Sequence, residues 1–141
     1  QDVEVFTGKN GLKVFLEEFA KDASFHDAFS FVSSSGKVFE TLEFYFPHYI
    51  RRVMKLRLKG RILAQRSIVK HKLFFRPLGL RMRWLPETYE PSSTFVVMND
   101  KLGIYNILEG EDPFIIMIRS ESIAQAYKDQ FDLMWKSASK K

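Results

Sequence analysis

The spacing of apolar residues predicts strands alternating with helices in the first half of the chain. Residues 3–6 and 28–32 show the short alternating or apolar runs that are typical of strands. Between them, residues 12–22 carry apolar side chains at helical spacing, which predicts an amphipathic helix. Asn10, in the turn before this segment, is expected to cap that helix.

A longer helical pattern covers residues 37–59. Pro47 interrupts it, and we expect a kink or a break there because proline removes a backbone donor and clashes with the preceding turn. Gly60 is expected to end the helix, and residues 61–65 to form a third strand. Residues 67–80 fit either a further helix or an irregular basic segment.

The second half of the chain predicts a β-meander followed by a closing helix. Strands are expected at residues 80–85, 94–98, 102–108 and 114–118. A hairpin turn is expected at residues 99–101, and Ser120 is expected to cap the last helix. The whole pattern predicts an α/β domain with a mixed central sheet flanked by helices.

Composition narrows the class of protein. The 141 residues fit one domain, and 45% apolar residues, including 14 Phe, supply a core. The absence of cysteine excludes disulfides, thiolate metal sites and cysteine nucleophiles, and is typical of the reducing cytoplasm. Three isolated histidines do not suggest a metal site, and no apolar run approaches the ~18 residues of a membrane-spanning helix. We therefore expect a cytoplasmic domain without metal, cofactor or membrane contact.

Charge is distributed unevenly along the chain. The net charge is +5, and no acidic residue occurs between Glu43 and Glu87. The basic residues of this interval include Arg51, Arg52, Lys55, Arg57 and Lys59. Such a block attracts polyanions, so residues 44–86 could form a nucleic-acid-binding module. The alternative is a solvated basic face that pairs with acids elsewhere in the fold, and the sequence leaves both open.

Five further residues, at three places in the chain, are candidates for binding a small ligand. Ser33, Ser34 and Ser35 follow an inner strand and precede a helical segment, where α/β sheets place ligands beyond the strand ends. Hydroxyl groups and backbone N–H groups there suit a polyhydroxyl or anionic ligand, although simple helix capping also explains them. Thr94 either points into a pocket or starts a strand, and Asn99 either binds a ligand or makes a hairpin turn.

Three stretches of the chain carry a resemblance to a known family. They are residues 3–13 (VEVFTGKNGLK), residues 95–104 (FVVMNDKLGI), and residues 113–124 (PFIIMIRSESIA) with the later Phe131 and Trp135. In this order they resemble the C-terminal sensing domain of TrmB-like transcription regulators, which resembles one half of the phospholipase-D fold.

The resemblance implies a domain that binds a small polar effector, such as a sugar, and that forms a homodimer. It also implies that a winged helix-turn-helix, which binds DNA, precedes this domain. The chain opens at Gln1 without Met, as expected for a piece of such a protein.

The same resemblance allows a test for catalysis. Phospholipase-D enzymes use a His-x-Lys-x-x-x-x-Asp motif, in which His is the nucleophile. On the predicted meander, the three positions hold Ser92, Thr94 and Asn99. The resemblance therefore implies that no catalytic residue is present and that the domain is not an enzyme.

Overall fold

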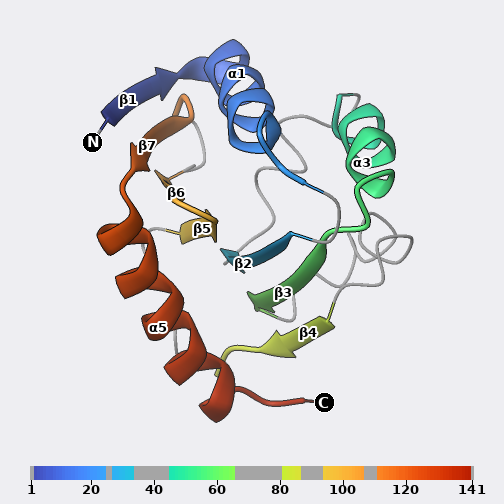
Figure 1. The fold of residues 1–141 in the computed structure, drawn as a ribbon, viewed down its shortest axis with the longest axis vertical. Helices are drawn as coiled ribbons and strands as arrows, with labels where there is room; N and C mark the ends of the chain where they lie inside the picture. Colours follow the sequence, from blue (N-terminus) through green and yellow to red (C-terminus); the bar gives the residue numbers. More distant parts are fainter. Residues whose placement is uncertain are drawn as a thin grey trace.

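The computed structural model of this chain describes residues 2–24, 27–33, 45–65, 81–86, 94–106 and 111–140. Within these residues a seven-stranded mixed sheet has the order β1-β7-β6-β5-β2-β3-β4 (Figure 1). The strands are β1 (Asp2–Thr7), β2 (Ala28–Ser33), β3 (Lys59–Ala64), β4 (Arg81–Trp84), β5 (Thr94–Met98), β6 (Lys101–Asn106) and β7 (Phe114–Arg119). The predicted α/β fold with a mixed central sheet is confirmed.

Strand directions define two opposite edges of the sheet. β2, β3 and β4 are parallel neighbours, whereas β1, β7, β6, β5 and β2 pair antiparallel in succession. As a result β1, β2, β3, β4 and β6 all end at one edge, which we call the carboxyl edge, and β5 and β7 begin there. The amino edge is the other one. Ligand sites of open α/β sheets lie beyond the carboxyl ends of parallel strands, so a ligand site is expected at the carboxyl edge.

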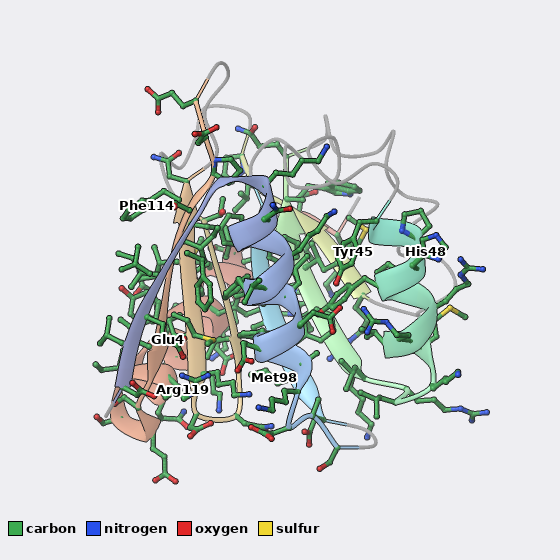
Figure 2. All side chains as sticks on the ribbon, turned by 90° about the horizontal axis from the view of Figure 1, so that it is seen from above. Glu4, Tyr45, His48, Met98, Phe114 and Arg119 are labelled. Carbon is green, nitrogen blue, oxygen red and sulfur yellow. The ribbon has the colours of Figure 1, made fainter. Side chains whose placement is uncertain are left out.

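Helices cover both faces of the sheet (Figures 1 and 2). The helices are α1 (Gly8–Ala20), α3 (Phe46–Met54) and α5 (Glu121–Ser137). α1 and α3 share one apolar cluster, to which Phe15 and Val53 belong. α5 buries Phe131 and Trp135 in a second cluster on the opposite face. Each face of the sheet therefore has its own core.

α1 begins earlier than its sequence predicts. Asn10 does not cap it, because the helix starts at Gly8 after an N-cap at Thr7 that makes no side-chain bond. Gly8 has a φ of 75°, which favours glycine, and its N–H donates to the Pro113 carbonyl at 2.9 Å. The sharp turn from β1 into α1 is therefore made by backbone geometry and not by a capping side chain.

The helical segment expected at residues 37–59 ends earlier than predicted. The predicted break at Pro47 agrees with the start of α3 at Phe46, because Pro47 lies in the first turn of this helix, where a missing N–H costs nothing. α3 ends at Met54, and Arg57 takes a φ of 48° in the following turn. Gly60 does not stop the helix but lies buried inside β3. Residues 34–44 and 66–80 lie outside the described part of the chain.

The meander and the last helix match the prediction closely. β5, β6, β7 and α5 fall within one or two residues of the expected positions. The turn is shorter than expected, since Lys101 belongs to β6 and its ammonium group donates to the Glu18 carbonyl at 2.9 Å. Ser120 caps α5 as predicted, because its hydroxyl accepts the N–H of Ile123 at 3.3 Å.

Candidate functional site

Two of the predicted ligand-binding positions lie together at the carboxyl edge. Ser33 is the last residue of β2, and Thr94 is the first residue of the antiparallel neighbour β5. Thr94 is 7% exposed and its hydroxyl donates to the Tyr105 carbonyl at 3.3 Å. Ser34, Ser35 and Ser92 lie outside the described residues. The structure thus brings Ser33 and Thr94 to one edge of the sheet.

Asn99 lies at the opposite edge. It forms the β5–β6 turn with a φ of 55°, and its amide donates to the Asp27 carboxylate at 2.9 Å. Its carbonyl accepts the ammonium group of Lys128 at 2.7 Å. Asn99 follows Thr94 by five positions along an extended strand, which corresponds to about 17 Å. The two positions therefore do not belong to one site.

The Asp27 carboxylate explains why Asn99 is placed there. The N–H of Ser24 and the Asn99 amide both donate to this carboxylate, and they lower the pKa of Asp27. The interaction joins the entry to β2 with the β5–β6 turn. Asn99 therefore acts as a turn residue, which is one of the two roles that the sequence allows for it.

Two of the positions on which the sequence resemblance placed the phospholipase-D motif are described, and both hold neutral groups. In that placement Thr94, the first residue of β5, corresponds to the lysine, and Asn99, in the turn after β5, corresponds to the aspartate. A buried hydroxyl that is bonded to a carbonyl cannot supply the positive charge that a transferred phosphate requires. Burial also raises the pKa of the nearby Tyr105 hydroxyl, so this group is neutral at physiological pH.

The five cations of the predicted nucleic-acid surface lie on α3, on the turn after it and at the start of β3, and all are exposed. Arg52 differs from the others, because it forms an ion pair with Glu17 of α1. Arg51 donates to Nδ1 of His48 at 2.6 Å. For Lys55, Arg57 and Lys59, no carboxylate partner occurs among the residues that the structure describes. Among the described residues, the five therefore divide into one arginine that is paired with a carboxylate and four exposed cations that are not.

Arg52 belongs to a polar cluster between α1 and α3. Its guanidinium and the Tyr45 hydroxyl both donate to Glu17, which lowers the pKa of Glu17. Burial and the Glu17 charge raise the pKa of Tyr45 to about 12. Figure 2 shows Tyr45 on the side of α3 that faces α1, and Lys13 lies 5.5 Å from the centre of its ring. A void of about 140 Å³ beside Glu17, Arg52 and Tyr49 is smaller than a typical ligand pocket.

A second basic cluster surrounds Trp135 on the α5 face. Arg61 and Arg83 lie 5.5 Å and 4.5 Å from the centre of the Trp135 ring, within the range of cation–π contact. Arg61 also forms an ion pair with Asp132 at 2.6 Å, and Arg83 donates to the Trp135 carbonyl at 2.7 Å. These contacts attach the end of α5 to β3 and β4, so they are structural.

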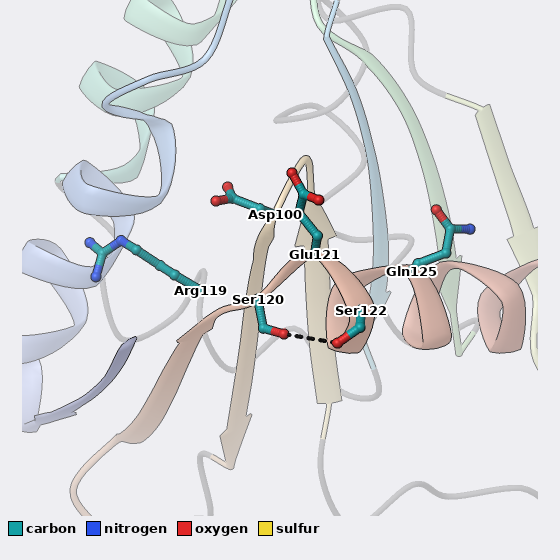
Figure 3. Close-up of a pocket in the computed structure, with 6 residues that line it drawn as sticks. All are labelled: Asp100, Arg119, Ser120, Glu121, Ser122 and Gln125. Carbon is teal, nitrogen blue, oxygen red and sulfur yellow. Dashed lines mark hydrogen bonds between the residues drawn. The ribbon is translucent and has the colours of Figure 1, made fainter. Parts of the chain in front are cut away.

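An open depression of about 670 Å³ lies where β7 meets α5 at the amino edge (Figure 3). Its lining consists of Asp100, Arg119, Ser120, Glu121, Ser122 and Gln125. Arg119 points away from the other five and bonds to Asp2, Glu4 and Glu18. The two carboxylates, Asp100 and Glu121, counteract the positive end of the α5 dipole. The depression therefore does not suit an anion.

The described residues contain no group of three or more His, Asp or Glu side chains that could hold a metal ion. No helix among them is long and apolar enough to cross a membrane.

Comparison with solved structures defines the fold class. Nuc from Salmonella typhimurium, a phospholipase D family member, matches 99% of this chain and 97% of its own with a TM-score of 0.71 at 11% identity. NucT from Helicobacter pylori matches 99% of both chains with a TM-score of 0.68 at 9% identity. This chain therefore has the phospholipase-D-like fold.

The match extends to a protein of the kind that the sequence resembles. TrmBL2, an archaeal chromatin protein with a novel mode of DNA binding, matches the whole chain with a TM-score of 0.70 at 13% identity. The chain spans 55% of the length of TrmBL2. No family model and no curated protein matches the sequence. The resemblance to TrmB-like proteins is thus confirmed at the level of the fold.

Sequence reasoning missed the partners that decide which cations are accessible. Glu17 and Tyr45 had not been connected with Arg52, although they fix its guanidinium. Glu17 lies 35 positions from Arg52 on another helix. Helical spacing indicates only that Glu17 is on the outer side of α1, so no local signal could have found this pair.

Proposed function

We propose that this chain is a regulatory domain of a DNA-associated transcription regulator, which senses a small polar effector and forms a homodimer without catalysing a reaction. The structural likeness to TrmBL2, an archaeal chromatin protein that binds DNA, supports the regulatory context. In this proposal a preceding winged helix-turn-helix reads DNA, and the present domain controls it.

The observation that carries the proposal is the state of Thr94. It stands where phospholipase-D enzymes place a lysine, and its buried hydroxyl bonds to the Tyr105 carbonyl. A phosphodiesterase of this fold needs a cation and a histidine nucleophile. Thr94, together with serine at position 92, supplies neither. In this proposal the chain has the fold of these enzymes but uses it only to bind a ligand.

The effector would bind at the carboxyl edge, around Ser33, Ser34, Ser35 and Thr94. Hydroxyl groups near the ends of parallel strands suit a sugar or a similar polyhydroxyl molecule. Asn99 is not part of this proposed site, because it lies at the amino edge. For regulation, the effector must bind one arrangement of the paired domains more tightly than the other.

A thermal-shift screen against sugars, sugar phosphates and nucleotides tests effector binding. A ligand at 100 times its Kd that binds only the native state adds about 2.7 kcal/mol, which corresponds to a shift on the order of 10 °C for a domain of this size. The variants Ser34→Ala and Ser35→Ala should reduce the shift. Ser122→Ala, in the first turn of α5 at the other edge, is the matched control and should keep it.

Two further measurements test the rest of the proposal. The purified protein should not hydrolyse bis(p-nitrophenyl) phosphate, and light scattering should give twice the monomer mass. Hydrolysis that co-purifies with the protein and persists in repeated preparations would overturn the non-catalytic assignment. A monomeric mass at all concentrations would overturn the dimer, and equal shifts in the serine variants and the native chain would overturn the effector site.

A further inference from the structure

The exposed side of α3 and the turn after it form a strip of positive charge. Between residues 47 and 60 the exposed positions are His48, Arg51, Arg52, Met54, Lys55, Arg57 and Lys59, and no acidic residue interrupts them. Met54 is the only large hydrophobic side chain among them, at 37% exposure. His48 lies on the side of α3 away from α1 (Figure 2).

Arg52 does not belong to the free charge of this surface. It is bonded to Glu17 and lies 3.3 Å from the Tyr45 hydroxyl, so it holds α3 against α1. We use the name α3 strip for the remaining four cations, which are Arg51, Lys55, Arg57 and Lys59. The backbone N–H of Lys59 donates to the Asp27 carbonyl at 2.8 Å, and the Asp27 carboxylate is itself bonded to Ser24 and Asn99.

The α3 strip follows a continuous path. Arg51 and Lys55 are four positions apart, which is about one helical turn, so they lie on the same side of the helix. The rise along the helix axis between them is about 6 Å. Arg57 takes a left-handed conformation in the turn, and Lys59 opens β3. The strip therefore continues from the helix through the turn to the amino edge of the sheet. Phosphates of duplex nucleic acid follow each other every 3.4 Å of axis on each strand, so a row of this kind can meet several of them.

We propose that the α3 strip contacts the phosphate backbone of duplex nucleic acid. The proposal goes beyond effector sensing and does not depend on it. A protein partner would need an aromatic or aliphatic anchor seated in a pocket, and none of the four cations lines either of the two cavities described above. A membrane surface would need an exposed apolar helix side, but Ile50 and Val53 of α3 are buried in the core.

The expected binding is independent of sequence and sensitive to salt. Four phosphate contacts give a slope of log K against log salt of about −3.6. Affinity should therefore fall roughly 150-fold between 50 and 200 mM NaCl. The proposal includes no contact with the bases, because the row of cations contacts the phosphate backbone of the nucleic acid and not the edges of its bases.

Fluorescence anisotropy of the full chain with two labelled 20-base-pair duplexes of unrelated sequence tests the proposal. The double variant Arg51→Gln/Lys55→Gln removes two charges from the α3 strip. It should reduce the slope to about −1.8 while leaving the melting temperature unchanged. The matched control Lys136→Gln/Lys140→Gln removes two exposed charges from the end of α5 and its tail, and should keep the slope of the native chain.

The proposal is overturned if the control loses as much slope as the strip variant, since net charge alone would then explain binding. It is also overturned if neither duplex binds at 25 mM NaCl. A third arm adds poly-glutamate or anionic phosphatidylserine vesicles as competitors at equal charge. Weak competition supports duplex binding, whereas competition as strong as that of unlabelled duplex would overturn it. Because none of these readouts involves the effector, the failure of one proposal is distinguishable from that of the other.

Discussion

α1 approaches the sheet closely at Gly103, and replacing this glycine by alanine tests the packing directly. A Cβ at position 103 would lie 2.6 Å from Cε1 of Phe15 and 3.4 Å from Cγ1 of Val96. The Phe15 ring cannot rotate away, because it is fully buried and packs between Phe6 and Phe19 with ring centroids 6.0 and 5.6 Å away. The added methyl group therefore forces α1 or β6 to move.

Forcing one extra methyl group into a filled core costs about 1–3 kcal/mol in unfolding free energy. We expect the upper half of this range, about 2–3 kcal/mol, because the ring is held on two sides. Urea denaturation followed by circular dichroism measures it, with a lower midpoint and an unchanged m-value. Phe15→Leu shortens the opposing side chain, so the double variant should be more stable than the sum of the single losses by about 0.5–3 kcal/mol.

Either of two results would refute this reasoning. The first is a loss below about 0.5 kcal/mol for Gly103→Ala, the value expected of an exposed position without close neighbours. The second is strict additivity in the cycle with Phe15→Leu, which would mean that the two positions do not touch. The close approach of α1 to β6 would then be wrong.

Three further predictions concern single polar contacts. Ser120→Ala removes the α5 cap and should cost about 1 kcal/mol in urea denaturation, whereas Ser122→Ala should cost much less. Arg52→Gln breaks the exposed pair with Glu17 and should cost about 0.2–1 kcal/mol of unfolding free energy, seen as a lower melting temperature; an unchanged melting temperature would contradict the link between α1 and α3. Asn99→Gly keeps the left-handed turn but removes a donor to Asp27. Because the folded pKa of Asp27 is lowered, its stabilisation is present above about pH 4 and is lost as the pH falls through the folded pKa. The difference in the urea midpoint between the native chain and Asn99→Gly should therefore shrink below pH 4. A difference that stays constant with pH would argue against the contact between Asn99 and the Asp27 carboxylate.

Most of the meander could be predicted from the sequence, because the residues at the ends of each strand indicate where it begins and ends. β5 and β7 are short apolar runs between turn residues, and α5 combines a capping serine with an apolar stripe. The predicted boundary between the helix around α3 and the next strand was wrong for a physical reason. Pro47 is compatible with both a kink and a helix start, and Gly60 with both a helix end and a buried strand position. For Gly60, the tertiary pairing of β3 with β2 selects the strand position.

The candidate effector site shows a similar limit. Thr94 and Asn99 belong to one motif in the linear sequence, but β5 lies between them and places them at opposite edges. Ser33 and Thr94 are 61 positions apart in numbering, yet antiparallel pairing of β2 with β5 brings them to the same edge. In this chain, closeness in the sequence therefore does not place Thr94 and Asn99 in one site, whereas strand pairing brings together residues that are far apart in the sequence.

The acid-free interval from residue 44 to residue 86 illustrates what the fold adds to a pattern of charge. From sequence alone, each of its cations counts equally, and a solvated face explains them as well as a binding surface does. Folding distinguishes them: Glu17 bonds to Arg52, and Asp132 bonds to Arg61, so both arginines are held by carboxylates from other elements. Arg51, Lys55 and their neighbours in the turn keep no such partner among the described residues. Acids from distant segments thus neutralise the cations that hold helices in place, and the charge left over along one side of α3 is the part available to an external polyanion.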